Sequence, residues 1–247
     1  MKRTPWFRDW FGGEYLALYP HRDRAEARRA VELLRDTAGL GSRTRVLDLA
    51  CGAGRHLVEL ERIGSRAVGL DLSQRMLAAA RDALPDAGLV RADMRHLPFR
   101  PASFDVVTSY FTSFGYFDDE SDDLGVLHGV RRVLRPGGVF LFDFMNADAV
   151  VTNLRTEDRR TVSGVDVIQE RRLVDGGRIV EKRISIGPRG GKPGREFVER
   201  VRLYRPGELE SMMIQAKLVP GRRFGGYDSS PFTLESPRYI VVAEASS

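Results

Sequence analysis

A turn that contains two glycines, at residues 50–54, offers the first recognisable chemistry in the sequence. It follows the apolar segment "VLDL" and opens a predicted helix, so backbone N–H groups at Gly52 and Gly54 can face a ligand. Glycine allows that ligand to approach where a Cβ would clash. A dinucleotide fingerprint would need a third glycine at Leu57, and a P-loop would need Gly-Lys-Ser/Thr. The turn therefore predicts a ligand of another class, held against the backbone.

Two aspartates follow the next two predicted strands and could bind a nucleoside. Asp71 comes 19 residues after Gly52, in "RAVGLDL", where a carboxylate can accept both hydroxyls of a ribose. Asp93 follows "GLVRA" and is placed to meet an adenine amino group, with Met94 beside the ring. Together with the glycine turn, these two acids predict a nucleoside site.

The segments that carry these residues alternate between strands and helices. The strands are apolar on both faces, which is typical of a parallel sheet covered by helices on each side. The sequence therefore predicts a doubly wound α/β fold. Helices are expected at 22–38, from about 54, and at 73–84, 120–134 and 206–218, and strands at 45–50, 66–72, 88–93, 104–110, 138–144, 219–227 and 238–245.

The alternation stops between residues 156 and 204. Here "RRTVSGVDVIQERRLV" and "RIVEKRISI" predict two strands around an Asp-Gly-Gly turn, and "EFVERVRLYR" predicts another, half-exposed strand. We predict a core domain of residues 1–155 plus 205–247 and a small antiparallel β insertion at 156–204. Because the insertion leaves from the carboxyl edge of the sheet, where α/β proteins bind ligands, it should roof the active site or form a homodimer contact.

Net charge and composition limit which binding partners and which cellular compartment we expect. The formal net charge is +5, and residues 155–205 hold 14 Lys/Arg against 8 Asp/Glu, which fits either a nucleic-acid grip or a solvated arginine-rich surface. No run of about 18 apolar residues predicts a membrane span. The single cysteine, Cys51, fits a reducing compartment. We therefore expect a cytoplasmic protein, with no membrane contact and no metal site.

Five segments, in their order and spacing, resemble the class I S-adenosylmethionine-dependent methyltransferases: "VLDLACGAGRH", "GLDLS", "RADMRHLPF", "FDVVTSYFTSFGYF" and "VLRPGGVFLFDF". The resemblance covers residues 45 to about 145, with a weaker one from Pro206 to Ala245. It implies a seven-stranded Rossmann-like sheet whose last strand is antiparallel. It also implies S-adenosyl-L-methionine as cofactor and methyl transfer by in-line displacement.

The resemblance further implies where parts of the cofactor lie. Asp48 would order the glycine turn and bond near the methionine amino group, and Gly52 and Gly54 would pass the methionine moiety. Tyr110, where the fourth strand ends, would stand beside the sulfonium. The adenosine half would be contacted by four residues that follow the second and third strands: Asp71, Leu72, Asp93 and Met94.

Two aromatic segments complete the expected site. The segment "PWFRDWFGGEYLALYP" resembles an arm that closes over the cofactor in some small-molecule members, with Tyr15 and Tyr19 covering the methionine end. The run "YFTSFGYF" after the fourth strand predicts a wall of the acceptor pocket. A general base is needed only if the acceptor arrives protonated. The candidates for that base are His21, Tyr116 and Asp118.

We expect the acceptor to be a small molecule. Nucleic-acid and protein amide methylases commonly carry Asn/Asp-Pro-Pro-Tyr/Phe after strand four, and "TSYFTSFGYF" stands there instead. Nucleic acid is therefore disfavoured as a partner. Two alternatives stay open: an RNA or protein methyltransferase that uses the basic insertion, and a non-catalytic S-adenosylmethionine-binding protein. The missing third glycine disfavours a nicotinamide oxidoreductase.

Overall fold

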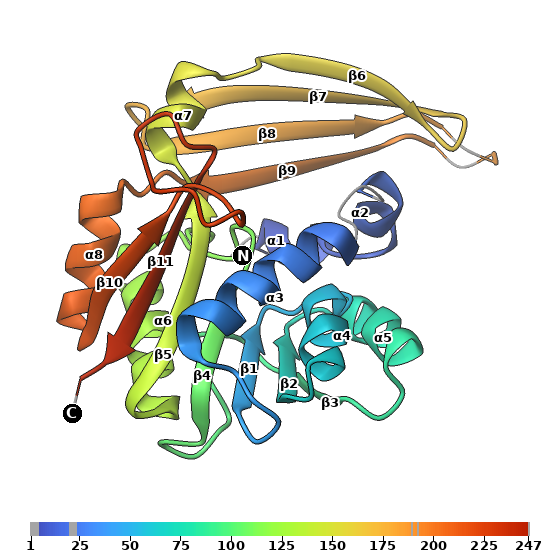
Figure 1. Ribbon diagram of the computed structural model, residues 1–247. Helices are drawn as coiled ribbons and strands as arrows, with labels where there is room; N and C mark the ends of the chain where they lie inside the picture. The colour runs from blue at the N-terminus through green and yellow to red at the C-terminus, as the bar shows by residue number, and fades with distance from the viewer. Residues whose placement is uncertain (1–4, 20–23, 189, 192, 247) are drawn as a thin grey trace.

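The computed structural model describes residues 5–19, 24–188, 190–191 and 193–246. Its larger part is built around a seven-stranded sheet with the order β10-β11-β5-β4-β1-β2-β3 (Figure 1). Strands β1 to β5 pair in parallel, and β11 runs antiparallel to both β5 and β10. This confirms the doubly wound sheet with an antiparallel last strand. The strands are β1 Arg45–Leu49, β2 Arg66–Asp71, β3 Gly88–Arg91, β4 Phe104–Ser109, β5 Leu134–Met145, β10 Leu218–Phe224 and β11 Arg238–Ala245.

Helices cover both faces of this sheet because successive strand residues point into two different apolar cores. In β1, Val46 packs with α3 and α4, whereas Leu47 and Leu49 pack with α6 and α8. Among the described residues, no helix has the length and apolar character needed to cross a membrane. The helices are α3 Arg24–Ala38, α4 Arg55–Arg62, α5 Gln74–Ala83, α6 Glu120–Val133, α7 Ala147–Thr152 and α8 Pro206–Gln215.

A second, four-stranded antiparallel sheet lies beyond the carboxyl ends of the parallel strands, and we call it the roof (Figure 1). The prediction of a single strand across "RRTVSGVDVIQERRLV" was wrong. Ser163 and Gly164 have φ values of 51° and 77° and form a two-residue hairpin turn there, so this stretch makes two strands. The roof consists of β6 Glu157–Val162, β7 Val165–Val174, β8 Ile179–Ile186 and β9 Arg195–Arg202.

Residues 5–19 form an arm that lies between the roof and the main sheet. It contains two short helices, α1 Trp6–Trp10 and α2 Gly13–Leu18. On the side of the main sheet, the carbonyl of Phe11 accepts a hydrogen bond from the Ser73 hydroxyl at 2.7 Å. The arm, which is part of the predicted core domain of residues 1–155, therefore covers one face of the half-exposed insertion. The buried residues of the arm–roof contact are Trp10, Leu18, Val167, Ile184 and Phe197.

Candidate active site

The glycine turn between β1 and α4 has a backbone that favours glycine. Gly52 and Gly54 have φ values of 56° and 79°, in the left-handed region. A Cβ added at Gly52 would lie 3.2 Å from Met76 Cε, and one at Gly54 would lie 3.1 Å from Ala80 Cβ. The glycines therefore also let the turn pack closely on α5, a reason that the sequence pattern alone did not supply.

Asp71 connects the end of β2 to the glycine turn. One carboxylate oxygen accepts the N–H of Gly52 at 2.9 Å, and the other accepts the N–H of Ser73 at 2.7 Å. Burial raises the pKa of Asp71, and the backbone hydrogen bonds oppose that rise. A carboxylate has about four lone-pair positions, so two remain for further donors. Asp71 can therefore hold the turn and still accept two ligand hydroxyls.

A cavity of about 110 Å³ opens beside Asp71, at the carboxyl edge of the main sheet. Its wall comes from the glycine turn, the ends of β2 and β3, the loop after β4, and the arm. Among the described residues, no roof residue lines it. Seven of the predicted site residues do: Tyr15, Gly52, Asp71, Leu72, Asp93, Met94 and Tyr116. Their roles toward a cofactor stay predictions.

Two phenylalanines of the arm, Phe7 and Phe11, line the cavity although only the tyrosines were singled out. Phe11 contacts Tyr15 and Tyr116, with ring centroids 4.9 and 5.8 Å apart. Phe7, Phe11 and Tyr15 are spaced four residues apart, which would place them on one face of a continuous helix, although the helix breaks between α1 and α2 at Phe11 and Gly12. That spacing is the signal that could have identified both phenylalanines.

Asp93 lines the cavity, but its carboxylate is occupied by Arg95. The guanidinium of Arg95 donates to both oxygens, at 3.1 and 2.8 Å, and also bonds Asp122 at 2.8 Å. Burial acts to raise the pKa of Asp93, and the bonds from Arg95 outweigh it and hold that pKa below its ordinary value. An adenine amino group would therefore share an acceptor that is already ionised and oriented.

Tyr110 was expected beside the sulfonium, but its side chain does not line the cavity. It is 3% exposed, and its ring stacks on His56 at 4.0 Å in the core beneath α3. The reason lies in the backbone: Phe111 and Thr112 adopt left-handed φ values of 56° and 58°. The chain turns there, and Phe111 lines the cavity instead.

Three other predicted residues that the structure describes, Gly54, Tyr19 and Asp118, do not line the cavity. Tyr19 turns toward the roof, where its hydroxyl accepts a hydrogen bond from Lys182 Nζ at 2.9 Å. Asp118 is exposed, and its carbonyl accepts a bond from Arg202. His21 lies outside the described residues. Of the two candidate bases that the structure describes, Tyr116 lines the cavity and Asp118 does not.

Asp48 is buried behind the glycine turn and does not line the cavity. It is 1% exposed and shares its face of β1 with Val46. One oxygen accepts the Thr108 hydroxyl at 3.2 Å, and the other has no partner in the part of the chain that the structure describes. Burial raises the pKa of Asp48 to about 7. The Asp48 carboxyl is therefore partly protonated and partly ionised at neutral pH.

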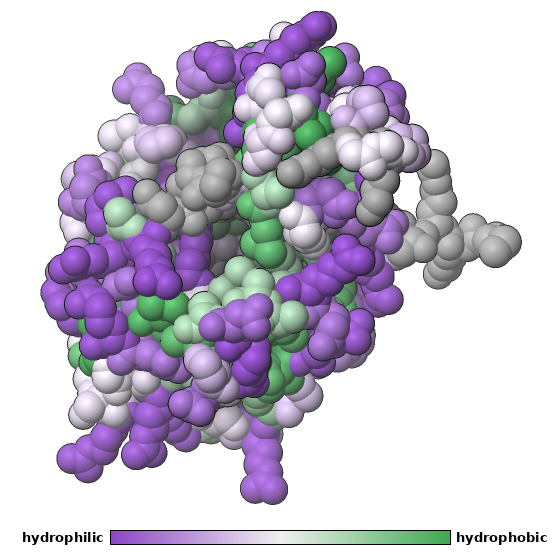
Figure 2. All heavy atoms as spheres, turned by 90° about the vertical axis from the view of Figure 1, so that its right-hand side faces the viewer, coloured by the Kyte–Doolittle hydropathy of each residue, from purple (hydrophilic) through white to green (hydrophobic). Residues whose placement is uncertain are grey.

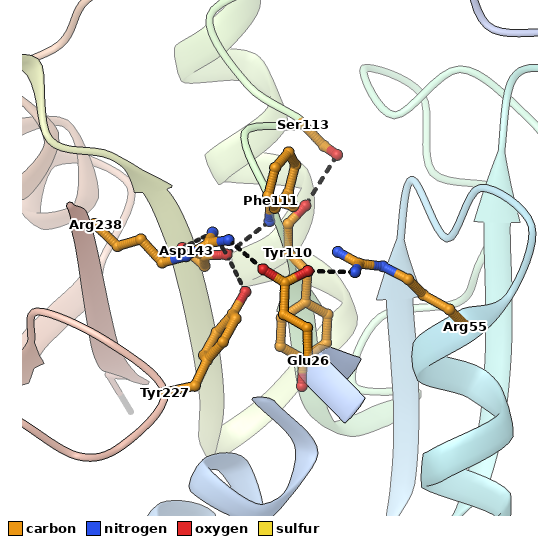
Figure 3. A network of polar contacts seen from close by, with 8 residues as sticks. All are labelled: Glu26, Arg55, Tyr110, Phe111, Ser113, Asp143, Tyr227 and Arg238. Atoms are coloured by element: carbon orange, nitrogen blue, oxygen red, sulfur yellow. Dashed lines mark hydrogen bonds and ion pairs between the residues drawn. The ribbon is translucent and has the colours of Figure 1, made fainter. Parts of the chain in front are cut away.

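A network of ion pairs holds Phe111 in place (Figure 3). Asp143 accepts the N–H of Phe111 at 2.8 Å and also binds Arg238 at 2.9 Å and the Tyr227 hydroxyl. Glu26 bridges Arg238 and Arg55, at 2.7 and 2.5 Å. Both guanidinium groups lie within 6 Å of the centre of the Phe111 ring. The wall of the cavity after β4 is therefore fixed from behind by four charged side chains.

The far end of the same loop is held by α6 and the roof. Asp123 accepts the N–H of Gly115 at 3.1 Å and the hydroxyl of Tyr204 at 2.9 Å, and it is fully buried. Arg202 N–H donates to the carbonyl of Gly115 at 2.8 Å. A Cβ at Gly115 would lie 2.9 Å from the Arg202 carbonyl oxygen. Tyr116, the next residue, is therefore held in position on the cavity wall.

Comparisons with known proteins agree with this fold. Residues 47–142 match a family model described as a methyltransferase domain. A putative methyltransferase of Bacillus subtilis is 34% identical over 109 residues, which cover 43% of this chain and 44% of that protein. The dTDP-3-amino-3,4,6-trideoxy-alpha-D-glucopyranose N,N-dimethyltransferase of Streptomyces venezuelae is 37% identical over 120 residues, which cover 48% of this chain and 49% of that protein. The matches thus span less than half of these relatives.

The likeness in structure extends over nearly the whole chain. A solved S-adenosylmethionine-dependent methyltransferase from Clostridium acetobutylicum is similar with a TM-score of 0.81 and 21% identity. The superposition covers 95% of this chain and 97% of the other. At 21% identity the likeness shows the fold alone. Because the superposition covers 95% of this chain, it includes at least part of the roof.

Proposed function

We propose that this chain, whose residues 47–142 form a methyltransferase domain, transfers a methyl group from S-adenosylmethionine to a small-molecule acceptor. The observation that carries the proposal is the Asp71 carboxylate, which is bonded to the N–H of Gly52 and lines the cavity. S-adenosylmethionine, when bound, supplies a methyl group whose carbon–sulfur bond breaks as the acceptor's lone pair attacks in line with it. The buried Cys51 also fits the proposed cytoplasmic location.

The contribution of the chain to such a reaction is mainly positioning. Holding two reactants in line can supply about 7–11 kcal/mol of the barrier in favourable cases. Phe111 and Tyr116 present aromatic surface to the cavity, and aromatic faces attract cations such as a sulfonium. Tyr116 is the described residue best placed to take a proton from an acceptor.

A small acceptor is favoured by the shape of the site. The arm covers the cavity, and aromatic side chains of the arm and of the loop after β4 close around it. A macromolecule would have to enter past both. The name of the Streptomyces venezuelae relative states a nucleotide-sugar substrate, which is also a small molecule.

Binding and turnover test the proposal separately. We expect calorimetry to detect binding of both S-adenosylmethionine and S-adenosylhomocysteine. A panel of amine, hydroxyl and thiol acceptors, supplied with labelled S-adenosylmethionine, should show transfer of the label to at least one member. Lack of binding to either nucleoside would refute the proposal, whereas binding without transfer or hydrolysis would favour the non-catalytic alternative.

The arm is expected to close over bound cofactor. Phe7, Phe11 and Tyr15 of the arm line the cavity, so the arm must move to admit a nucleoside. Saturating S-adenosylhomocysteine should slow tryptic cleavage after the exposed Arg8 by about tenfold or more, because a bound ligand depletes the open form. The variant Asp71→Ala should show no such protection. Equal cleavage rates with and without ligand in the parent protein would rule out a lid.

The basic roof is expected to bind RNA only weakly. Three of its basic residues are neutralised within the same sheet: Arg171 pairs with Asp158, Arg172 with Glu181, and Lys182 with Glu199. Fluorescence anisotropy with a labelled 20-nucleotide RNA should therefore show a shallow dependence on salt between about 50 and 200 mM. Submicromolar affinity with a steep salt dependence, lost when Arg171, Arg172, Lys182 and Arg183 are neutralised, would favour an RNA methyltransferase instead.

A further inference from the structure

A partly buried polar cluster joins the roof to the arm on the side away from the cavity. Lys182 of β8 and Glu199 of β9 form an ion pair, and their side chains are only 15% and 16% exposed. The indole N–H of Trp10 donates to Glu199, and Lys182 donates to the Tyr19 hydroxyl at 2.9 Å. Both aromatic residues of the arm are thus fixed by one pair of charges.

The rest of the contact between arm and roof is mostly apolar, although Glu14 also pairs with Arg195, Arg160 donates to the Leu18 carbonyl at 2.9 Å, and Gln169 donates to the Tyr19 hydroxyl at 3.4 Å. Trp10 packs on Phe197 with ring centroids 4.7 Å apart, next to Val167 and Ile184. Figure 2 shows, on the side of α2 and α5, apolar surface gathered in a central band with hydrophilic residues around it. A groove between α2 and the roof has a mostly apolar lining. Apolar contact alone would let the arm settle in several positions, because it is not directional.

The ion pair is not needed to hold the arm against the roof. Burying two charges costs desolvation energy, and apolar residues of similar volume often hold such an interface as well or better. What a partly buried pair bonded to both rings adds is a single geometry. Here that geometry fixes Trp10 and Tyr19.

Ring contacts carry this geometry to the cavity. Trp10 and Tyr19 each contact Tyr15, with ring centroids 5.6 and 5.0 Å apart. Tyr15 contacts Phe11 at 4.9 Å, and both rings line the cavity. The roof therefore reaches the cavity through the arm, along a continuous chain of packed side chains, in addition to its contact with Gly115 through Arg202.

We propose that Lys182 and Glu199 are positioning residues for cofactor retention: they hold the arm closed over the cavity without touching the cofactor. This inference rests on the proposed function, in which the arm covers bound S-adenosylmethionine. To admit or release the cofactor, the arm must leave the roof, and the bonds from Trp10 and Tyr19 to this pair must break. The pair therefore sets how fast the cofactor leaves.

Stopped-flow tryptophan fluorescence with S-adenosylhomocysteine tests the inference. Glu199→Gln removes the charge and keeps the shape, and we expect dissociation about tenfold faster with association no slower, because a charge-assisted bond to the arm is lost. The matched control is Glu181→Gln, which breaks the Arg172 pair on the outer face of the same sheet. It should leave the dissociation rate unchanged.

A second variant separates positioning from stability. The double variant Lys182→Met, Glu199→Met keeps the volume of the contact without its charges and should unfold at the same or a higher temperature. We expect it to release S-adenosylhomocysteine about tenfold faster nonetheless. Slow release from this variant or from Glu199→Gln would overturn the inference, whereas failure of the parent protein to bind S-adenosylhomocysteine would overturn the proposed function itself.

Discussion

Replacing Asp71 with alanine is expected to weaken binding of S-adenosylhomocysteine about 100-fold or more. Two ribose hydroxyls would lose a charged acceptor, and a hydrogen bond to a charged group contributes about 1.5–3 kcal/mol. The same change frees the N–H of Gly52, which Asp71 holds at 2.9 Å, so the turn beside the ligand also loses its anchor. Isothermal titration calorimetry on both proteins measures the difference directly.

Two further variants serve as an intermediate case and a control for Asp71→Ala. Asp71→Asn keeps one acceptor oxygen and should lie between the parent and Asp71→Ala in affinity. Asp82→Ala removes an exposed acid from α5 and should bind like the parent. If a folded Asp71→Ala protein binds S-adenosylhomocysteine with unchanged affinity, the ribose assignment is wrong.

Much of the fold could be predicted because the hydrophobic pattern of the main sheet is regular. The parallel strands are apolar on both faces, and the predicted glycine turn and Asp71 fall where β1 and β2 end. These residues meet because parallel strands present their carboxyl ends at one edge. Leu72, Asp93 and Met94 follow from the same rule and line the same cavity.

The acceptor side could not be predicted as well, because it depends on backbone conformation that residue type does not fix. Phe111 and Thr112 adopt left-handed φ values without being glycine, and this exchanges Phe111 for Tyr110 on the cavity wall. Asp143 and Arg238, which hold Phe111, lie far along the chain from it. No local pattern connects residues that only tertiary packing brings together.

The arm shows a further limit of prediction from the sequence. Its aromatic composition predicted a cover for the ligand, and Tyr15 does line the cavity. Tyr19 turns instead to the roof, because Lys182 offers its hydroxyl a charged donor. A sequence pattern can show that a segment has aromatic residues to bury, but it cannot assign each ring to one of two available surfaces.

Replacing Asp48 with asparagine is expected to stabilise the ligand-free protein at high pH. Burial raises the pKa of Asp48 from 3.8 to about 7 in the folded state. The folded protein therefore keeps a proton that the unfolded chain releases, and the free energy of unfolding falls as the pH rises from about 4 to about 7. Asparagine cannot ionise, so the advantage of Asp48→Asn should grow over this range to roughly 4 kcal/mol. Urea unfolding at pH 4, 6 and 8 measures it.

Asp105 provides a control of opposite sign. Its bonds with Arg45, opposed by burial and reinforced by Arg135, hold its pKa below the ordinary value. Its contribution to stability is present above about pH 4 and is lost as the pH falls through the lowered pKa. Asp105→Asn should therefore be less stable than the parent at neutral pH. If Asp105→Asn is less stable than the parent at pH 8 and Asp48→Asn is not more stable than the parent, the burial argument for Asp48 fails.

The carboxyl of Asp48 is also expected to make cofactor binding depend on pH. Asp48 lies behind the glycine turn that the methionine moiety is expected to pass, so the ammonium of the cofactor would act on Asp48 across that turn and favour its ionised form. Below pH 7 the cofactor must first displace a proton, so affinity for S-adenosylhomocysteine should rise by up to about tenfold per pH unit toward pH 7 and level off above it. Calorimetry in two buffers of different ionisation enthalpy should detect the released proton at pH 6. Asp71 also has a raised pKa, so the decisive comparison is with Asp48→Asn. That variant should bind more weakly at pH 8 and lose most of the pH dependence; a slope equal to that of the parent would assign the proton to Asp71 or another group.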